Sequence, residues 1–280
     1  GLVLGGGAAR GFAHFGVLRV LEQAGIAWDM MGGTSGGGYV SAFRAMGKTI
    51  DEAYAICVRE TVDRNPLADV TLPVTALTRG KVVSRAVQRA FGSTLVEDLP
   101  IDFFVVASDL VAGTPAILDH GSLGEACLAS ATLPGIFPPV RRGRMLLVDG
   151  GLMQNVPGPV MKARGADLVI AVDLSSERDV PFDAPGTETQ PKGWLPKLLR
   201  RSGGMRDLLE APRIIPILMR SLEILMQSAV RGNLWSFDVH IRPQVGGFGM
   251  LSWKDHLKLE ERGRMAAESQ LPALQREIAA

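Results

Sequence analysis

The stretch Leu2–Gly11 (LVLGGGAARG) opens the chain with three apolar residues, followed by a run of glycine and alanine that ends at Arg10 and Gly11. An apolar run that passes directly into glycines predicts a short core strand followed by a tight loop. A second junction of this kind lies at 30–37 (MMGGTSGG), where a predicted strand leads into a predicted helix. Two strand–glycine–helix units in succession favour a parallel sheet with helices on its faces.

The rest of the chain continues this alternation. We therefore expect an α/β protein with a mostly parallel central sheet and helices on its faces. No internal repeat is found, and residues 1–280 are interpreted as a single domain. Because the sequence begins directly in a predicted core strand, we expect it to be a fragment of a longer protein. Further strands are predicted at 103–108, 114–118, 145–148, 168–172 and 237–241, and helices near 50–63, 81–91, 122–131, 157–164, 205–229 and 255–277.

Composition restricts the possible classes of function. The chain is 46% hydrophobic and 21% charged, which is typical of a globular protein. Its net charge of +1 argues against nucleic acid as a partner. The two cysteines, Cys57 and Cys127, indicate no disulfide framework and favour a reducing compartment. We expect a location on the cytoplasmic side. No apolar run reaches the roughly 18 residues that would span a bilayer.

Residues 180–231 differ in character from the rest of the chain. The part over 180–204 is rich in proline and glycine, and 190–231 carries eight basic residues against three acidic ones, interleaved with apolar side chains. Such an insertion can lie on an anionic membrane surface, which predicts peripheral membrane association. The alternative is an ordinary packing helix with a solvated basic face. The basic residues are Lys192, Lys197, Arg200, Arg201, Arg206, Arg213, Arg220 and Arg231.

The segment Gly33–Gly37 (GTSGG) matches the G-x-S-x-G pattern between a predicted strand and a predicted helix. Small residues on both sides of Ser35 permit a tight turn that projects its Oγ away from the backbone. The simpler alternative is a glycine-rich turn whose serine caps a helix. The strand–turn–helix context favours Ser35 as a nucleophile, with Gly33 and Gly37 forming its elbow.

The loop Gly5–Gly11 can direct successive backbone N–H groups into one concavity, which would suit an oxyanion or a phosphate. A dinucleotide site requires G-x-G-x-x-G/A and an acidic residue about 20 positions later. Asp29 is suitably placed, but the glycine spacing fails, since Arg10 or Ala8 falls where a glycine is needed. We therefore expect an oxyanion loop and no nucleotide cofactor.

A serine nucleophile needs a base, and Asp149 ends the predicted strand 145–148. We expect it at the carboxyl edge of the sheet, where α/β proteins place their ligands, with Gly150 and Gly151 letting its carboxylate approach Ser35. The simpler alternative is an aspartate that anchors a turn.

Histidine bases are a further alternative. The order Ser35, Asp149 and then His240 or His256 would satisfy an α/β-hydrolase triad. That fold places several strands before its elbow, however, whereas only one predicted strand precedes it here. His14 falls on the first predicted helix, and His120 is the fourth histidine of the chain.

In this order and with these neighbours, the motifs resemble the patatin-like phospholipase family, above all its neuropathy-target-esterase branch and related bacterial proteins. The resemblance covers nearly the whole chain. Besides the two glycine-rich segments it includes Gly16-Val17-Leu18, Ser130-Ala131, Pro134, Phe137-Pro138-Pro139, the segment 149–157 (DGGLMQNVP), the strand 168–173 and the helix around Gly263.

The resemblance implies a three-layer α/β/α sandwich and a Ser–Asp dyad without histidine, in which Ser35 is the nucleophile and Asp149 the general base. Backbone N–H groups of Gly6, Gly7 and Ala8 would form the oxyanion hole, supported by Arg10 and Gly11. Ala8 stands where the family usually has glycine. Because alanine has poor access to positive φ, we expect Ala8 in the αR or β region, or an N–H that is aimed differently.

The resemblance also implies a lipid ester as substrate, most of all a lysophospholipid, and neither a metal nor another cofactor. A general fatty-acyl carboxylesterase is the alternative, as is a membrane-docked regulatory module whose site is degenerate. Apolar residues between 194 and 226 would line an acyl channel, and the basic residues of that segment would meet a phosphate headgroup.

Overall fold

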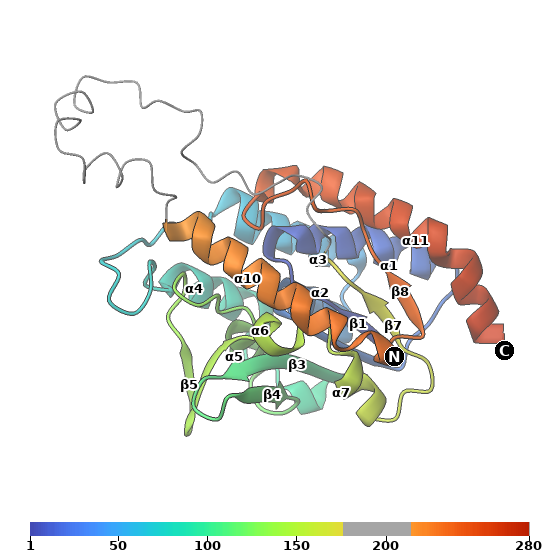
Figure 1. Cartoon of the computed structure of the whole chain (residues 1–280), viewed down its shortest axis with the longest axis horizontal. Helices are drawn as coiled ribbons and strands as arrows, with labels where there is room; N and C mark the ends of the chain where they lie inside the picture. Colours follow the sequence, from blue (N-terminus) through green and yellow to red (C-terminus); the bar gives the residue numbers. More distant parts are fainter. Residues whose placement is uncertain (176–213, 280) are drawn as a thin grey trace, which may run out of the picture.

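A computed structural model describes residues 1–175 and 214–279 of the chain. The first and last parallel strands of the sheet, β3 (Asp102–Asp109) and β8 (Val239–Ile241), enclose β2 (Met30–Thr34), β1 (Leu2–Leu4) and β7 (Ile170–Val172) in that order (Figure 1). Two strands run against them, namely β4 (Thr114–Leu118) and β6 (Met145–Asp149), and β5 (Val140–Arg142) pairs antiparallel with β6 at the edge of the sheet. The sheet is therefore mixed and mostly parallel, as predicted.

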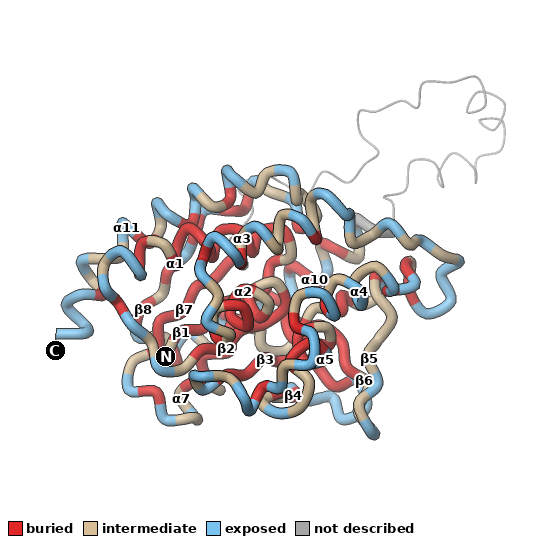
Figure 2. The backbone as a smooth tube through the Cα atoms, turned by 180° about the vertical axis from the view of Figure 1, so that it is seen from behind, coloured by how far each residue is buried: buried red, intermediate tan, exposed pale blue. Residues whose placement is uncertain are grey.

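Both faces of the sheet are covered, because successive side chains of a strand point to opposite sides. Leu2 and Leu4 pack into a large cluster with α1 (Ala13–Gln23) and α2 (Ser35–Ala45). Val3, between them, packs on the other side. The first face also receives α5 (Leu123–Ser130) and α11 (His256–Ala279), and the second face receives α7 (Gly158–Ala163) and the end of α10 (Ile214–Arg231). Figure 2 shows the buried strands between these helices, which confirms the predicted three-layer sandwich.

Most helices form close to their predicted positions. The predicted helix 50–63 is α3 (Ile50–Val58), which begins with a capping box between Thr49 and Glu52 and continues into a π-helical turn, η2 (Arg59–Asp63). The helix predicted over 205–229 is α10, whose predicted first part, 205–213, lies outside the described residues. The remaining elements are η1 (Ala8–Phe12), α4 (Lys81–Phe91), η3 (Val96–Asp98), α6 (Gly151–Gln154), η4 (Leu234–Ser236) and η5 (Trp253–Asp255).

Two strand predictions needed correction. The strand predicted over 168–172 begins only at Ile170, and the one predicted over 237–241 only at Val239, where η4 occupies the preceding turn. β5 was not predicted at all: it is an edge strand of three residues, two of them arginine, and it shows no apolar alternation. Its pairing with β6 is a tertiary contact that local pattern does not encode.

Candidate active site

Ser35 stands at the junction of β2 and α2, where the chain turns sharply. Its φ of 53° lies in the left-handed region, which costs a non-glycine residue on the order of 1–3 kcal/mol. Its N–H donates to Ser130 Oγ at 2.9 Å, and that hydroxyl in turn donates to the carbonyl of Val106 at 2.6 Å. The strained serine is therefore held by a buried polar chain that links the elbow to α5 and β3.

The glycines after Ser35 let α2 lie against the end of β1. A Cβ at Gly37 would lie 2.2 Å from the carbonyl oxygen of Leu4, and one at Gly33 would lie 2.8 Å from the carbonyl carbon of Gly37. Backbone therefore packs on backbone at this turn. A larger residue at either position would push α2 away from β1 or β2.

Asp149 reaches Ser35 through the register of three strands. Along β3, Val106 pairs with Thr34 of β2, and the next residue, Ala107, pairs with Asp149 of β6. Because β4 occupies the opposite edge of β3, β2 and β6 share one edge and meet end to end. Asp149 is the last residue of β6, as predicted, but β6 runs antiparallel to β3, which the sequence did not indicate.

The Asp149 carboxyl group is fully buried. Burial raises its pKa to about 6, while hydrogen bonding from the Ser35 hydroxyl and from the Gly151 N–H opposes the rise. Oδ1 accepts the Gly151 N–H at 2.8 Å. Oδ2 receives no hydrogen bond of regular geometry from the described residues, so the contact with Ser35 is looser than a regular hydrogen bond. A desolvated carboxylate beside a hydroxyl can act as a general base.

The glycine loop lies against the elbow. A Cβ on Gly6 would be 3.2 Å from Ser35 Cβ. The Gly6 N–H donates to the Asn155 carbonyl at 3.1 Å, and Asn155 Nδ2 donates to the Gly6 carbonyl at 3.3 Å. Gly6 is thus fixed by Asn155, which corrects its predicted place among the oxyanion donors. No described residue accepts a hydrogen bond from the N–H of Gly7 or Ala8.

Ala8 adopts a positive φ of 49°. The expected αR or β conformation was therefore wrong: the loop requires a left-handed residue here, and alanine adopts this conformation at a cost in backbone strain. Gly36 lies against it, since a Cβ on Gly36 would be 3.0 Å from the Ala8 carbonyl oxygen.

Two buried side chains brace this loop from behind. Arg10 donates from Nε to the Phe248 carbonyl at 2.8 Å and pairs through Nη2 with Glu223 of α10 at 2.9 Å. His14 contacts the Gly5 carbonyl through Nε2 at 2.8 Å. Burial lowers the pKa of His14 to about 4, so this imidazole is neutral at pH 7. It supports the loop and does not contact Ser35.

The other histidines lie away from the serine. His240 contacts Asp173 at 3.2 Å, His256 contacts the Tyr54 hydroxyl at 2.7 Å, and His120 is exposed beside Asp119. The cavity that Ser35 lines contains none of the four histidines. The geometry therefore offers Ser35 a carboxylate rather than an imidazole.

A cavity of about 150 Å³ opens over Ser35. Its floor includes Ala8 and Gly11 of the glycine loop, and its walls are mostly apolar side chains of α2, α3 and α4. The expected acyl-channel residues between 194 and 226 do not line it where they are described. Met219, Leu222 and Met226 pack instead into a separate cluster with Leu133 and Ile136. Residues 194–213 lie outside the described part of the chain.

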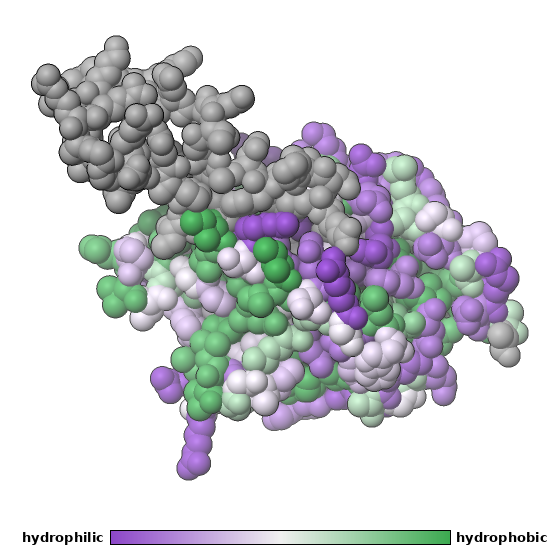
Figure 3. Space-filling view, in the orientation of Figure 1, coloured by the Kyte–Doolittle hydropathy of each residue, from purple (hydrophilic) through white to green (hydrophobic). Residues whose placement is uncertain are grey.

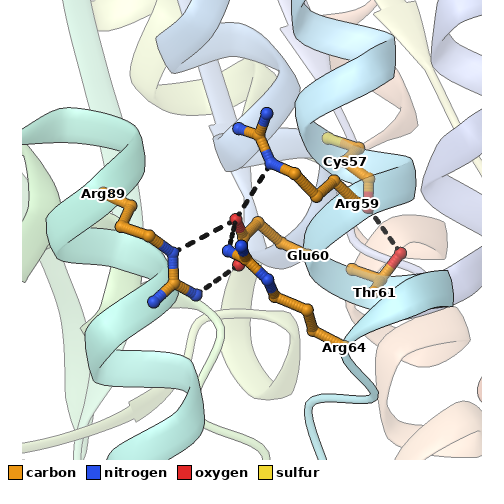
Figure 4. Close-up of polar contacts among 6 residues, drawn as sticks. All are labelled: Cys57, Arg59, Glu60, Thr61, Arg64 and Arg89. Carbon is orange, nitrogen blue, oxygen red and sulfur yellow. Dashed lines mark hydrogen bonds and ion pairs between the residues drawn. The ribbon is translucent and has the colours of Figure 1, made fainter.

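The outer wall of the cavity contains one buried carboxylate, Glu60. Arg59, Arg64 and Arg89 converge on it, with Arg64 Nη1 at 2.6 Å (Figure 4). Burial alone would raise the pKa of Glu60, but the hydrogen bonds and charges of the arginines outweigh burial and hold the pKa below its usual value. Glu60 therefore remains an anion and ties η2 to α4.

The described residues contain no group of three or more histidine, cysteine, aspartate or glutamate side chains placed to hold a metal ion. Within the same residues, no helix combines the length and apolar character needed to cross a bilayer.

Residues 2–160 match the family described as Patatin-like phospholipase. The chain belongs to this family. It is also 40% identical over 278 residues to an uncharacterised NTE family protein of Mycobacterium tuberculosis, which covers 98% of this chain and 46% of that protein. It is 33% identical over 261 residues to human patatin-like phospholipase domain-containing protein 6, covering 88% of this chain and 18% of that protein.

Other similarities fit this patatin-like assignment. Lysophospholipase NTE1 of Candida glabrata is 36% identical over 184 residues, or 64% of this chain and 11% of that protein. The fold resembles the crystal structure of VipD from Legionella pneumophila, with a TM-score of 0.54, 14% identity and coverage of 97% of this chain and 66% of VipD. The chain spans about half the length of the mycobacterial relative, or less of the others.

Three supporting residues of this patatin-like site had no role in the sequence reasoning. Ser130 and Asn155 lie within segments that carry the family resemblance, but only the structure shows that they hold Ser35 and Gly6. His14 was placed on the first predicted helix, with no partner assigned to it. A histidine three residues after the glycine loop was the only available signal.

Proposed function

We propose that this chain is a serine lipid acyl hydrolase in which Ser35 is the nucleophile and Asp149 its general base. The observation that carries the proposal is a fully buried carboxylate beside a strained elbow serine, at the floor of an apolar cavity. Strained backbone and a raised carboxyl pKa are features that proteins concentrate at catalytic sites.

The proposed reaction has two steps. Asp149 takes the Ser35 proton while Oγ attacks the ester carbonyl, and the N–H groups of Gly7 and Ala8 stabilise the oxyanion, each by roughly 3–4 kcal/mol. The alcohol leaves with the proton returned from Asp149. Water, deprotonated by Asp149, then attacks the acyl-serine, releasing the fatty acid and restoring Ser35. No step requires a metal ion.

For the substrate we propose a lysophospholipid, with general fatty-acyl esters as the alternative. The name of the Candida glabrata relative, Lysophospholipase NTE1, supports this choice. The apolar lining of the cavity supports an acyl chain as the group that is bound there. Peripheral attachment to the cytoplasmic side of a membrane is part of the same proposal, supported by the basic character of 190–231.

The test compares Ser35→Ala and Asp149→Asn with the matched variants Ser41→Ala and Asp167→Asn. We expect Ser35→Ala to lose fluorophosphonate labelling, and both site variants to lose about 10⁴-fold in kcat/KM on a p-nitrophenyl acyl ester. Circular dichroism should be unchanged. The control variants should keep near-normal rates. Full activity in Asp149→Asn would refute the dyad, and lipid binding by a wild type without turnover would favour a regulatory module.

The pH profile provides a second test of the base. Asp149 must be deprotonated to accept the serine proton, and its pKa is about 6. We expect kcat/KM to rise with pH, reach half of its maximum near pH 6 and stay level above pH 7. A profile that falls over this range would exclude Asp149 as the base.

A further inference from the structure

The segment between η2 and α4 presents apolar side chains to solvent. Val70 is 69% exposed, Leu72 84% and Val74 89%. These values are far above those of the core. Leu72 and Val74 lie at the tip of one loop, and Val70 lies at its base, where it pairs with Thr78. In Figure 3, hydrophobic side chains gather over this edge of the molecule and along α10 on the same face. Several large apolar residues exposed together usually mark an interaction surface.

Hydrogen bonds anchor the base of this loop to the segment around Gly135 and Ile136. The Thr71 N–H donates to the Leu77 carbonyl at 2.9 Å, and the Leu77 N–H donates to Gly135 at 2.9 Å. The buried Thr78 hydroxyl donates to the Ile136 carbonyl at 2.8 Å. The exposure of Leu72 and Val74 therefore belongs to an ordered hairpin-like loop.

The same segment forms part of the cavity wall over Ser35. Pro66 and Leu67, which precede the tip, line the cavity, and so do Val82 and Val83, which follow it on α4. A partner that binds the tip of this loop would therefore lie beside the cavity that Ser35 lines.

Positive charge surrounds the loop. Arg59, Arg64 and Arg89 have side chains between 41% and 53% exposed, and their shared partner Glu60 is buried. Residues 59–89 hold six basic residues against three acidic ones, Glu60, Asp63 and Asp69, so this wall carries a net positive charge. Arg79, Lys81 and Arg85 are exposed nearby, while the Asp69 carboxylate is occupied in capping the N-terminus of α4. An apolar tip within a basic rim is complementary to an anionic lipid surface.

We propose that the loop over residues 64–80 docks the protein onto an anionic phospholipid leaflet, with Leu72 and Val74 inserted among the acyl chains and the neighbouring arginines on the headgroup phosphates. This inference rests on the proposed function. Docking through this loop would place the cavity next to the membrane, from which a lipid ester would enter.

The first experiment measures co-sedimentation with vesicles of phosphatidylcholine containing one-fifth phosphatidylglycerol. We expect wild type to bind, and Leu72→Asp/Val74→Asp to lose about tenfold or more in partitioning. A matched control is Leu257→Asp, at a residue that is 67% exposed on α11, and it should bind like wild type. Binding should weaken in high salt and in pure phosphatidylcholine. Wild-type partitioning in the double aspartate variant would overturn the proposal.

A second measurement reports insertion directly. An environment-sensitive fluorophore attached to Leu72→Cys should shift to shorter emission wavelengths on adding vesicles, and one attached to Leu257→Cys should not. Burial raises the pKa of Cys57 to about 12 and that of Cys127 further, so the native thiols label slowly. An unshifted emission from position 72 would contradict insertion.

The soluble p-nitrophenyl ester separates this inference from the proposed function. The double aspartate variant should hydrolyse it at the wild-type rate while losing turnover on vesicle-borne lysophospholipid. If wild type fails to hydrolyse any ester but still binds vesicles through the loop, the hydrolase proposal fails and docking stands. If hydrolysis is intact and vesicles are not bound, docking fails alone.

Discussion

The floor and the outer wall of the cavity are built on opposite physical principles. The floor includes Ser35 and residues of the glycine loop, and it rests on the ends of β1, β2 and β6, where Asp149 is buried and backbone packs directly on backbone. The wall, over residues 56–90, has exposed apolar and arginine side chains around a single buried carboxylate, Glu60.

The two regions therefore contain different kinds of groups. The floor holds strained and desolvated groups, which only a surrounding rigid core can maintain. The wall contributes surface-exposed ion pairs, whose individual energies are small because water screens them. Substitutions in the floor should therefore have large effects on folding, and substitutions in the wall should be tolerated.

Gly150→Ala should have the largest effect on stability. A Cβ there would lie 2.1 Å from the Val106 carbonyl oxygen, within the contact that aligns β6 with β2. We expect a loss of about 3 kcal/mol or more in the free energy of unfolding, measured by urea denaturation. Gly247→Ala is the matched control, since nothing lies within 4 Å of its Cβ position. An unchanged free energy of unfolding in Gly150→Ala would show that the backbone around Val106 can move to accept the added methyl group.

Asp149→Asn should stabilise the protein while abolishing turnover. The folded-state pKa of about 6 lies above the unfolded value of 3.8, so the folded protein binds the Asp149 proton more tightly. The stability of wild type therefore falls as the pH rises from about 4 to 6 and levels off above, by about 2–3 kcal/mol at most.

The asparagine variant lacks this titration. We expect its free energy of unfolding to exceed that of wild type at pH 8 and to approach it near pH 4. Parallel pH curves for the two proteins would show that the buried carboxylate is not destabilising.

Glu60→Gln should have the smallest of the three effects. It removes the common partner of three arginines, but these are partly exposed and can be solvated. We expect a loss of about 1 kcal/mol in the free energy of unfolding, smaller in high salt, with soluble-ester turnover close to wild type. Arg262→Gln, on the distant α11, serves as control. A loss comparable to that of Gly150→Ala would show that wall and floor fold as one cooperative unit.

The two glycine-rich turns were predictable because their requirements are local. A strand that ends in Gly5–Gly7 and another that ends in Gly33–Gly37 leave few backbone solutions, and each predicted helix followed at the expected place. The wall was less predictable. Residues 194–226 were expected to line the acyl site, because apolar composition shows that a segment can be buried but not against which partner.

By itself, the sequence determined the α/β architecture, the elbow serine and the aspartate that stands beside it, since each depends on neighbouring residues in one short segment. The tertiary structure alone decided how they meet: β6 runs against β3 and abuts the end of β2, which brings together residues more than a hundred positions apart. It also committed the Gly6 N–H to Asn155 and forced Ala8 into a left-handed conformation. Strand direction and register result from the packing of the whole sheet, whereas a turn is fixed by the few residues that form it.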